Sequence, residues 1–250
     1  MNRCLVTALA VVASVSSSES ATSHPILVEL FTSQGCYSCP PADRLLSRLG
    51  RDKGGAVVPL AFHVDFWNSM GWRDPFSSSA WSRRQEAYGR ALCLKSGYTP
   101  QAVVHGLAEV VGSDEERLLA AVATAAARPA AELSLALESG ASEVTARVQL
   151  KIPESLRERR WDLMLAVYET GLITEVKTGE NKGRELHNDY VVRSLRRERL
   201  KKDDSPVSEV SSKLPLEEDW KRSQLGVVAF LQDPKSLEIG GVAAESLEGR

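Results

Sequence analysis

The chain has little cysteine, little excess charge of either sign and no long apolar run after its N-terminus. Only 4 of its 250 residues are cysteines, too few for a small disulfide-stapled scaffold. Lysine and arginine number 31 against 33 aspartates and glutamates, so the formal net charge is −2. Without a basic stripe we expect no nucleic-acid partner. No later segment approaches the roughly 18 apolar residues of a membrane-spanning helix, so we expect no membrane span.

The first twenty residues have the pattern of an export signal. Arg3 gives a short basic start, residues 5–15 (LVTALAVVASV) form an apolar run, and small residues follow. The run is too short to cross a bilayer as a helix. We therefore expect residues 1–20 to be a signal peptide that is cleaved from a periplasmic or secreted protein. The alternative is an apolar N-terminus without this role.

The remaining cysteines form one close pair and one single residue. Cys4 would leave with the signal, which leaves Cys36, Cys39 and Cys93. A pair with two residues between its members is typical of a catalytic or metal-binding site. Cys93 lies among apolar residues of a helical segment, so we expect a small buried residue, with a redox-partner role as the alternative.

The first half has the pattern of an α/β layer. The continuous apolar run 25–31 (PILVELF) predicts a buried strand. Residues 40–50 predict a helix that carries its prolines in the first turn, where their N–H groups are not needed, and ends at Gly50. Further strands are expected at 56–66, 102–105 and 108–111, with helical segments at 79–95 and 113–127.

After Pro129 the pattern changes to alternating apolar and polar residues. Residues 132–138 and 144–152 show the period of a half-buried strand. Residues 201–218 are charged and contain proline, which predicts a long loop. The series predicts an α/β domain at 24–128 followed by an antiparallel β-rich, sandwich-like domain at 130–245. Its other strands are expected at 161–169, 191–195, 224–231 and 237–242.

The cysteine pair lies between a predicted strand and the start of a predicted helix. A helix N-terminus presents free N–H groups and partial positive charge, which favour a thiolate. We therefore interpret Cys36 as the attacking thiol and Cys39 as the resolving thiol, with exchange through a mixed disulfide on Cys36.

Two other uses of the pair stay open at this point. A purely structural disulfide is one, although so short a loop gains little chain entropy. A copper or zinc carrier is the other, but zinc takes about four ligands and no second such pair exists, so His63 or Cys93 would have to contribute. We expect neither a resident cofactor nor a resident metal.

Several segments resemble a family of exported thioredoxin-like proteins known as domain of unknown function 1223. They are VELFTSQGCYSCPPAD, LAFHVDFWNSMGWRDPF and YTPQAVVHG, with GENKGREL and VVRSL later in the chain. The resemblance implies a thioredoxin-like domain at 24–128 with a helical insertion at 67–97. It implies no particular substrate.

The wider thioredoxin superfamily implies three further site residues. Thr99 and Pro100 match the position of a cis-proline that faces the cysteine pair, where a substrate chain can pair as an added strand. Glu29 matches a buried acid that takes the proton of the resolving thiol. The alternative for Glu29 is a glutamate that faces solvent.

The other polar residues of these segments have weaker interpretations. We expect Trp67, Trp72 and Trp81 to be core residues. His63 and Asp65 share a strand face and either line the site or form structural hydrogen bonds. No role is assigned to the loop pair Arg73 and Asp74. We expect residues 179–186 (GENKGREL) to be a structural turn.

These observations together predict an exported thiol–disulfide oxidoreductase. Its substrate would be a protein or small-molecule thiol or disulfide, and it would need a redox partner. Tyr37 and Ser38 supply no cation beside the thiols, which favours a reductant over a strong oxidant. A metal carrier and a non-catalytic binding module on a thioredoxin-like scaffold are the alternative functions.

Overall fold

The computed structural model describes residues 24–52, 55–200 and 207–247. The predicted signal peptide and Cys4 lie outside these residues. Within them, no helix is both long enough and apolar enough to cross a membrane.

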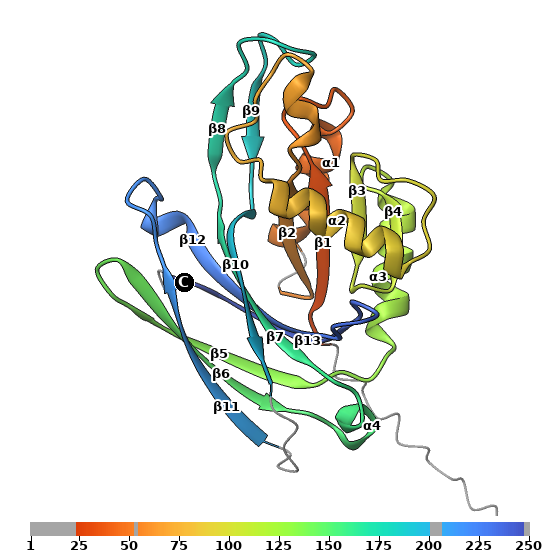
Figure 1. Cartoon of the computed structure of the whole chain (residues 1–250), viewed down its shortest axis with the longest axis vertical. Coiled ribbons are helices and arrows are strands. Elements are labelled where there is room, and N and C mark those ends of the chain that lie inside the picture. Colours follow the sequence, from red (N-terminus) through yellow and green to blue (C-terminus); the bar gives the residue numbers. More distant parts are fainter. Residues whose placement is uncertain (1–23, 53–54, 201–206, 248–250) are drawn as a thin grey trace, which may run out of the picture.

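The centre of the molecule is a mixed sheet of eight strands (Figure 1). Their order across the sheet is β13-β12-β7-β10-β2-β1-β3-β4. Strand β2 runs parallel to both β1 and β10, and the other neighbours are antiparallel. The strands are β1 (Ile26–Thr32), β2 (Val57–His63), β3 (Gln101–Val104), β4 (Ala108–Val111), β7 (Asp162–Glu169), β10 (Val191–Arg199), β12 (Leu225–Gln232) and β13 (Ile239–Ser246).

This sheet crosses the domain boundary that the sequence predicts near residue 129. The link is β10, which lies beside β2 with Val191 opposite Ala61, and the Ala61 amide donates to the Tyr190 carbonyl. Strand β2 is buried along its whole length and apolar up to His63, so an open edge there would leave buried backbone groups unpaired. Strands from both halves of the chain therefore share one sheet.

Helices cover both faces of the β1–β4 side of the sheet. Leu27 and Phe31 of β1 face the cluster that includes Trp81 and Tyr88 of helix α2 (Ser79–Ala91). The alternate residues of β1 face the other cluster, which holds helices α1 (Pro40–Asp52) and α3 (Glu115–Ala126). Burial on both faces explains why β1 is a nearly continuous apolar run.

A second sheet of three strands packs on one face of the other half of the main sheet, against β7 and β12. Its order is β11-β6-β5, formed by Val207–Pro215, Glu143–Lys151 and Glu132–Ser139. Alternate residues of β7, such as Leu165, meet this sheet in a shared core, and Met164 and Ala166 face the α2 side. The protein is therefore α/β, with strands far outnumbering helices.

Three predictions of local structure were wrong. Residues 207–215 form strand β11, not a loop, because Ser212 takes an inward position between Val210 and Leu214 and hides the alternation. Helix α1 continues past Gly50 to Asp52, since the absent side chain makes room for the Tyr190 ring.

The third difference is an antiparallel hairpin, β8 (Leu172–Glu175) and β9 (Glu185–Asn188), in a segment with no predicted strand. The remaining short elements are η1 (Phe66–Ser69), α4 (Glu154–Arg157) and η2 (Arg222–Gln224).

The shared core predicts that both halves unfold together. Phe230 of β12 is fully buried in the cluster that holds Phe31 and Phe62. Phe230→Ala should lower the free energy of unfolding by about 3–5 kcal/mol. Urea unfolding followed by tryptophan fluorescence and far-UV circular dichroism should show one shifted transition, whereas the exposed Ile173→Ala should leave it unchanged. A separate, unshifted step would contradict the shared core.

Candidate functional site

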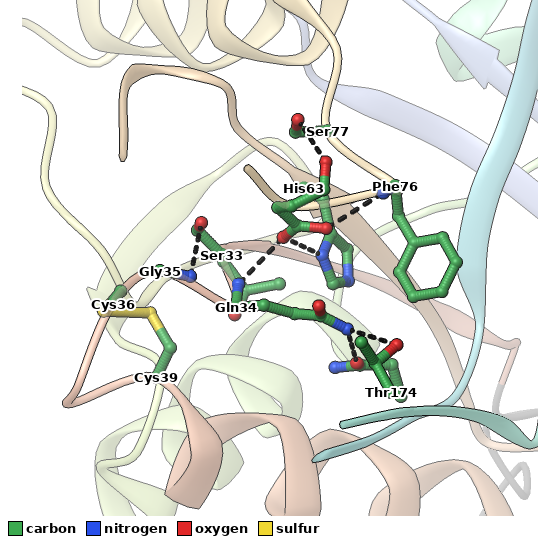
Figure 2. Close-up of polar contacts among 12 residues, drawn as sticks. Ser33, Gln34, Gly35, Cys36, Cys39, His63, Phe76, Ser77 and Thr174 are labelled. Atoms are coloured by element: carbon green, nitrogen blue, oxygen red, sulfur yellow. Dashed lines mark hydrogen bonds and ion pairs between the residues drawn. A yellow bond between two sulfur atoms is a disulfide. The ribbon is translucent and has the colours of Figure 1, made fainter. Parts of the chain in front are cut away.

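The two cysteines form a disulfide where β1 leads into α1. Cys36 and Cys39 have a Cα–Cα distance of 5.4 Å. Cys39 immediately precedes α1, and its carbonyl accepts from the amides of Ala42 and Asp43 in the first helical turn. The pair therefore occupies the helix N-terminus, as the sequence predicts, and Figure 2 shows it at the end of the connecting loop. We call residues 33–39 the dithiol loop.

The Thr99–Pro100 peptide bond is cis and lies beside the disulfide. The Sγ atom of Cys36 is 3.9 Å from the Thr99 carbonyl oxygen. The Trp67 indole donates to the Thr99 hydroxyl at 2.8 Å, and the Gly112 amide donates to the Pro100 carbonyl at 2.9 Å. The predicted cis bond and its position facing the cysteines are both confirmed.

Both cysteines are fully buried, each with 0% exposure. Between them in the sequence, Tyr37 is 61% exposed, so this part of the dithiol loop reaches the surface although the cysteines do not. Trp67 lies against Gly35 on one side of the dithiol loop. An incoming thiol therefore meets protein before it meets the Cys36 sulfur.

The segment between β8 and β9 covers the dithiol loop, and we call residues 178–184 the covering loop. The Asn181 side-chain amide donates to the carbonyls of Gln34 and Cys36, both at 2.9 Å. The Tyr37 amide donates to the Glu180 carboxylate at 3.0 Å. The sequence predicts only a structural turn here, and this contact with the dithiol was missed.

Gln34 ties the dithiol loop to the hairpin and to the 67–97 insertion. Its side-chain amide donates to Thr174 of β8 and Asn188 of β9, at 3.0 and 2.9 Å. The Trp72 indole donates to the side-chain oxygen Oε1 of Gln34 at 3.2 Å. Trp81 is a core residue as expected, whereas Trp67 and Trp72 border the dithiol loop.

A buried group of charged side chains lies behind the dithiol loop. His63 Nδ1 is 2.7 Å from the Asp74 carboxylate, which also accepts from the backbone amide of Gln34 at 2.8 Å (Figure 2). Burial acts to lower the pKa of His63, but attraction to Asp74 raises that pKa above its ordinary value. Burial acts to raise the pKa of Asp74, but the His63 charge holds it below its usual range. The two therefore form a buried ion pair that anchors Gln34.

Asp43 is the second acid in this group, on the first turn of α1. It lies four residues after Cys39, so the two share a helix face. Thr32 donates to its carboxylate at 2.8 Å. Burial raises the pKa of Asp43 to about 6, because the opposing effects of His63 and Thr32 only partly offset desolvation. An acid in a first helical turn is so common that its presence in the sequence did not single out Asp43.

Glu29 is buried but already paired. Its carboxylate accepts from the Arg84 guanidinium at 2.5 and 3.0 Å and from the Tyr88 hydroxyl at 2.5 Å. It lies on the α2 face of β1, whereas α1, which follows the cysteines, lies on the other face. The structure thus excludes a solvent-facing glutamate and places Asp43, not Glu29, on the helix that the cysteines begin.

Two other side chains differ from their expected positions. Cys93 is exposed, in a left-handed conformation (φ 55°) just after α2, and is not the buried residue that the sequence predicts. Asp65 does not join His63, because it precedes η1 and accepts from the Ser82 hydroxyl at 2.5 Å. Across the part of the chain that the structure describes, no three His, Cys, Asp or Glu side chains are grouped to hold a metal.

Comparison with known proteins places the chain in a family. A family profile described as "Protein of unknown function (DUF1223)" matches residues 27–232. The chain belongs to the DUF1223 family. No curated protein sequence matches it significantly.

Two solved structures extend the similarity over nearly the whole chain. A protein of Agrobacterium tumefaciens is 26% identical, with a TM-score of 0.67, and the match covers 90% of this chain and 95% of that one. HBP35 of Porphyromonas gingivalis is 16% identical, with a TM-score of 0.68, over 90% of this chain and 75% of that one. The second likeness shows a shared fold only.

The raised pKa of Asp43 predicts a pH-dependent gain in stability for Asp43→Asn. Because the folded pKa of about 6 exceeds the ordinary 3.8, ionised Asp43 destabilises the fold above pH 6, and this effect vanishes below pH 3.8. From pH 4 to pH 7.5, the stability of Asp43→Asn relative to the unsubstituted protein should rise by about 2 kcal/mol. Urea unfolding at a series of pH values measures this. The exposed Asp219→Asn is the control, and a flat difference for Asp43→Asn would contradict the prediction.

Proposed function

We propose that this protein is an exported thiol–disulfide oxidoreductase that works by exchange at Cys36 and Cys39. The observation that carries the proposal is the position of the pair, at the N-terminus of α1 and beside the Thr99 carbonyl. The N–H groups of a helix start stabilise the thiolate that exchange requires. The signal-like pattern of residues 1–20 supports export.

The arrangement of the first four strands supports a thioredoxin-like fold for the first half. The order β2-β1-β3-β4, with β3 antiparallel to β1, joins a strand–helix–strand unit to a hairpin. Helices lie on both faces of these strands. The strands after residue 130 form a β-rich extension, part of which continues the same sheet.

The exchange reaction moves two electrons through one mixed disulfide. In the reducing direction, the Cys36 thiolate attacks a substrate disulfide, forms a new S–S bond, and one substrate sulfur leaves as a thiolate and takes a proton. The Cys39 thiolate then attacks Cys36 Sγ, closes the internal disulfide and releases the second substrate thiolate. We assign the acceptance of the Cys39 proton to Asp43, which follows Cys39 by one helical turn and has a raised pKa.

The proposal predicts different losses for the two cysteines. The protein should catalyse the reduction of insulin disulfides by dithiothreitol, and Cys36→Ser should abolish this catalysis. In Cys39→Ser, Cys36 can still attack the substrate disulfide, but no second thiol can resolve the mixed disulfide. The mixed disulfide should therefore accumulate and be visible by mass spectrometry. Cys93→Ser is the matched control and should keep full turnover, because its side chain is outside the site.

A redox titration separates this function from its alternatives. Equilibration in dithiothreitol buffers, followed by acid trapping, should give a defined midpoint for the Cys36–Cys39 bond. A metal carrier would instead retain stoichiometric copper or zinc after challenge with a chelator. A binding module would show neither turnover nor metal. Either of these last two results would overturn the proposal.

A further inference from the structure

Burial of the disulfide raises the question of how a second sulfur reaches it. Disulfide exchange depends on access of the attacking thiolate to one sulfur of the bond. Cys36 is 0% exposed, although its neighbour Tyr37 lies at the surface. The part of the molecule that covers Cys36 must therefore influence exchange.

Asn181 is the buried centre of that cover. It is fully buried, and its amide donates to two backbone carbonyls of the dithiol loop, those of Gln34 and Cys36. Its own Oδ1 atom accepts from the Arg184 guanidinium at 3.0 Å. The Cys36 carbonyl also accepts from the Cys39 amide at 3.3 Å, but among the described residues Asn181 is the one donor to the Gln34 carbonyl, so loss of its amide leaves that acceptor unsatisfied.

The rest of the covering loop holds Asn181 in place. The Lys182 amide donates to the Gly179 carbonyl, and the Gly183 amide donates to Val176. Gly179 and Gly183 have φ values of 78° and 79°, a left-handed conformation that glycine adopts without strain. The loop is therefore a tight turn built to present one amide side chain inward.

A second set of contacts acts on Tyr37, the residue after Cys36. The Glu180 carboxylate accepts from the Tyr37 amide, and the Arg184 guanidinium lies 4.4 Å from the centre of the Tyr37 ring. Both contacts hold Tyr37, and with it the dithiol loop, against the covering loop.

We propose that Asn181 is a positioning residue that holds Cys36 in a shielded position and so limits sulfur exchange at the disulfide. The covering loop, which belongs to the second half of the chain, thereby controls the redox centre of the first half. The effect of Asn181 on catalysis rests on the proposed oxidoreductase function. A physiological partner must release the two Asn181 hydrogen bonds before its sulfur reaches Cys36.

The test is the rate at which dithiothreitol reduces the Cys36–Cys39 bond in the full mature chain. One dithiothreitol thiolate attacks Cys36 Sγ, and Cys39 leaves as a thiolate that is then protonated. The second dithiothreitol thiolate closes the reagent's own disulfide and releases Cys36. Rapid acid quenching and mass spectrometry give the rate constant.

Two substitutions of Asn181 separate hydrogen bonding from shape. Asn181→Ala removes the side chain, and Asn181→Asp keeps its shape but loses both donated hydrogen bonds. Each should accelerate reduction by about tenfold, the effect of losing two ordinary hydrogen bonds. Lys182→Ala, at the exposed neighbouring position, should change the rate by less than about twofold.

Phe230→Ala controls for general loss of stability, since it weakens the core without touching the covering loop. Rates for both Asn181 variants within twofold of the unsubstituted protein, or an equal acceleration by Phe230→Ala, would overturn the inference. Acceleration by the Asn181 variants without insulin turnover in any variant would leave the positioning role standing and refute the oxidoreductase function. Normal turnover with unchanged rates in the Asn181 variants would refute the positioning role alone.

Discussion

The site depends on the two hydrogen bonds that Asn181 donates to the backbone of the dithiol loop. These hydrogen bonds can form because β10 pairs with β2. This pairing brings the second half of the chain against the first. That pairing brings the β8–β9 hairpin to the start of α1, where Gln34 binds both of its strands. Backbone pairing in the sheet thus determines which side chain reaches the cysteines.

Two buried acids, Glu29 and Asp43, lie on opposite faces of the main sheet and have different electrostatic surroundings. Glu29 has a full complement of partners in Arg84 and Tyr88, so its charge is neutralised where it lies. Asp43 accepts from the Thr32 hydroxyl and is attracted by the His63 charge, but desolvation outweighs both and raises the pKa of Asp43 to about 6. An acid that changes protonation near neutral pH is the one suited to exchange protons with a thiol.

The sequence predicts what local patterns determine. The buried run before Cys36, the helix after Cys39 and the position of Pro100 all follow from neighbouring residues. The pairing of Ala61 with Val191 does not, because 130 residues separate the two and neither segment encodes its partner. For the same reason the role of Asn181 was invisible. A polar residue between two glycines reads as a turn until tertiary structure shows that its amide points inward.

The burial of the disulfide agrees with a structural role as well as with a guarded redox role, and magnitudes separate the two. A closed loop of this length stabilises the folded chain by only about 2 kcal/mol in the chain-entropy model. One core phenylalanine such as Phe230 contributes more. The pair also has an Asp43 carboxylate with a raised pKa one turn away and a dedicated hairpin above it. A simple staple needs neither of these, and both fit the redox role that we propose.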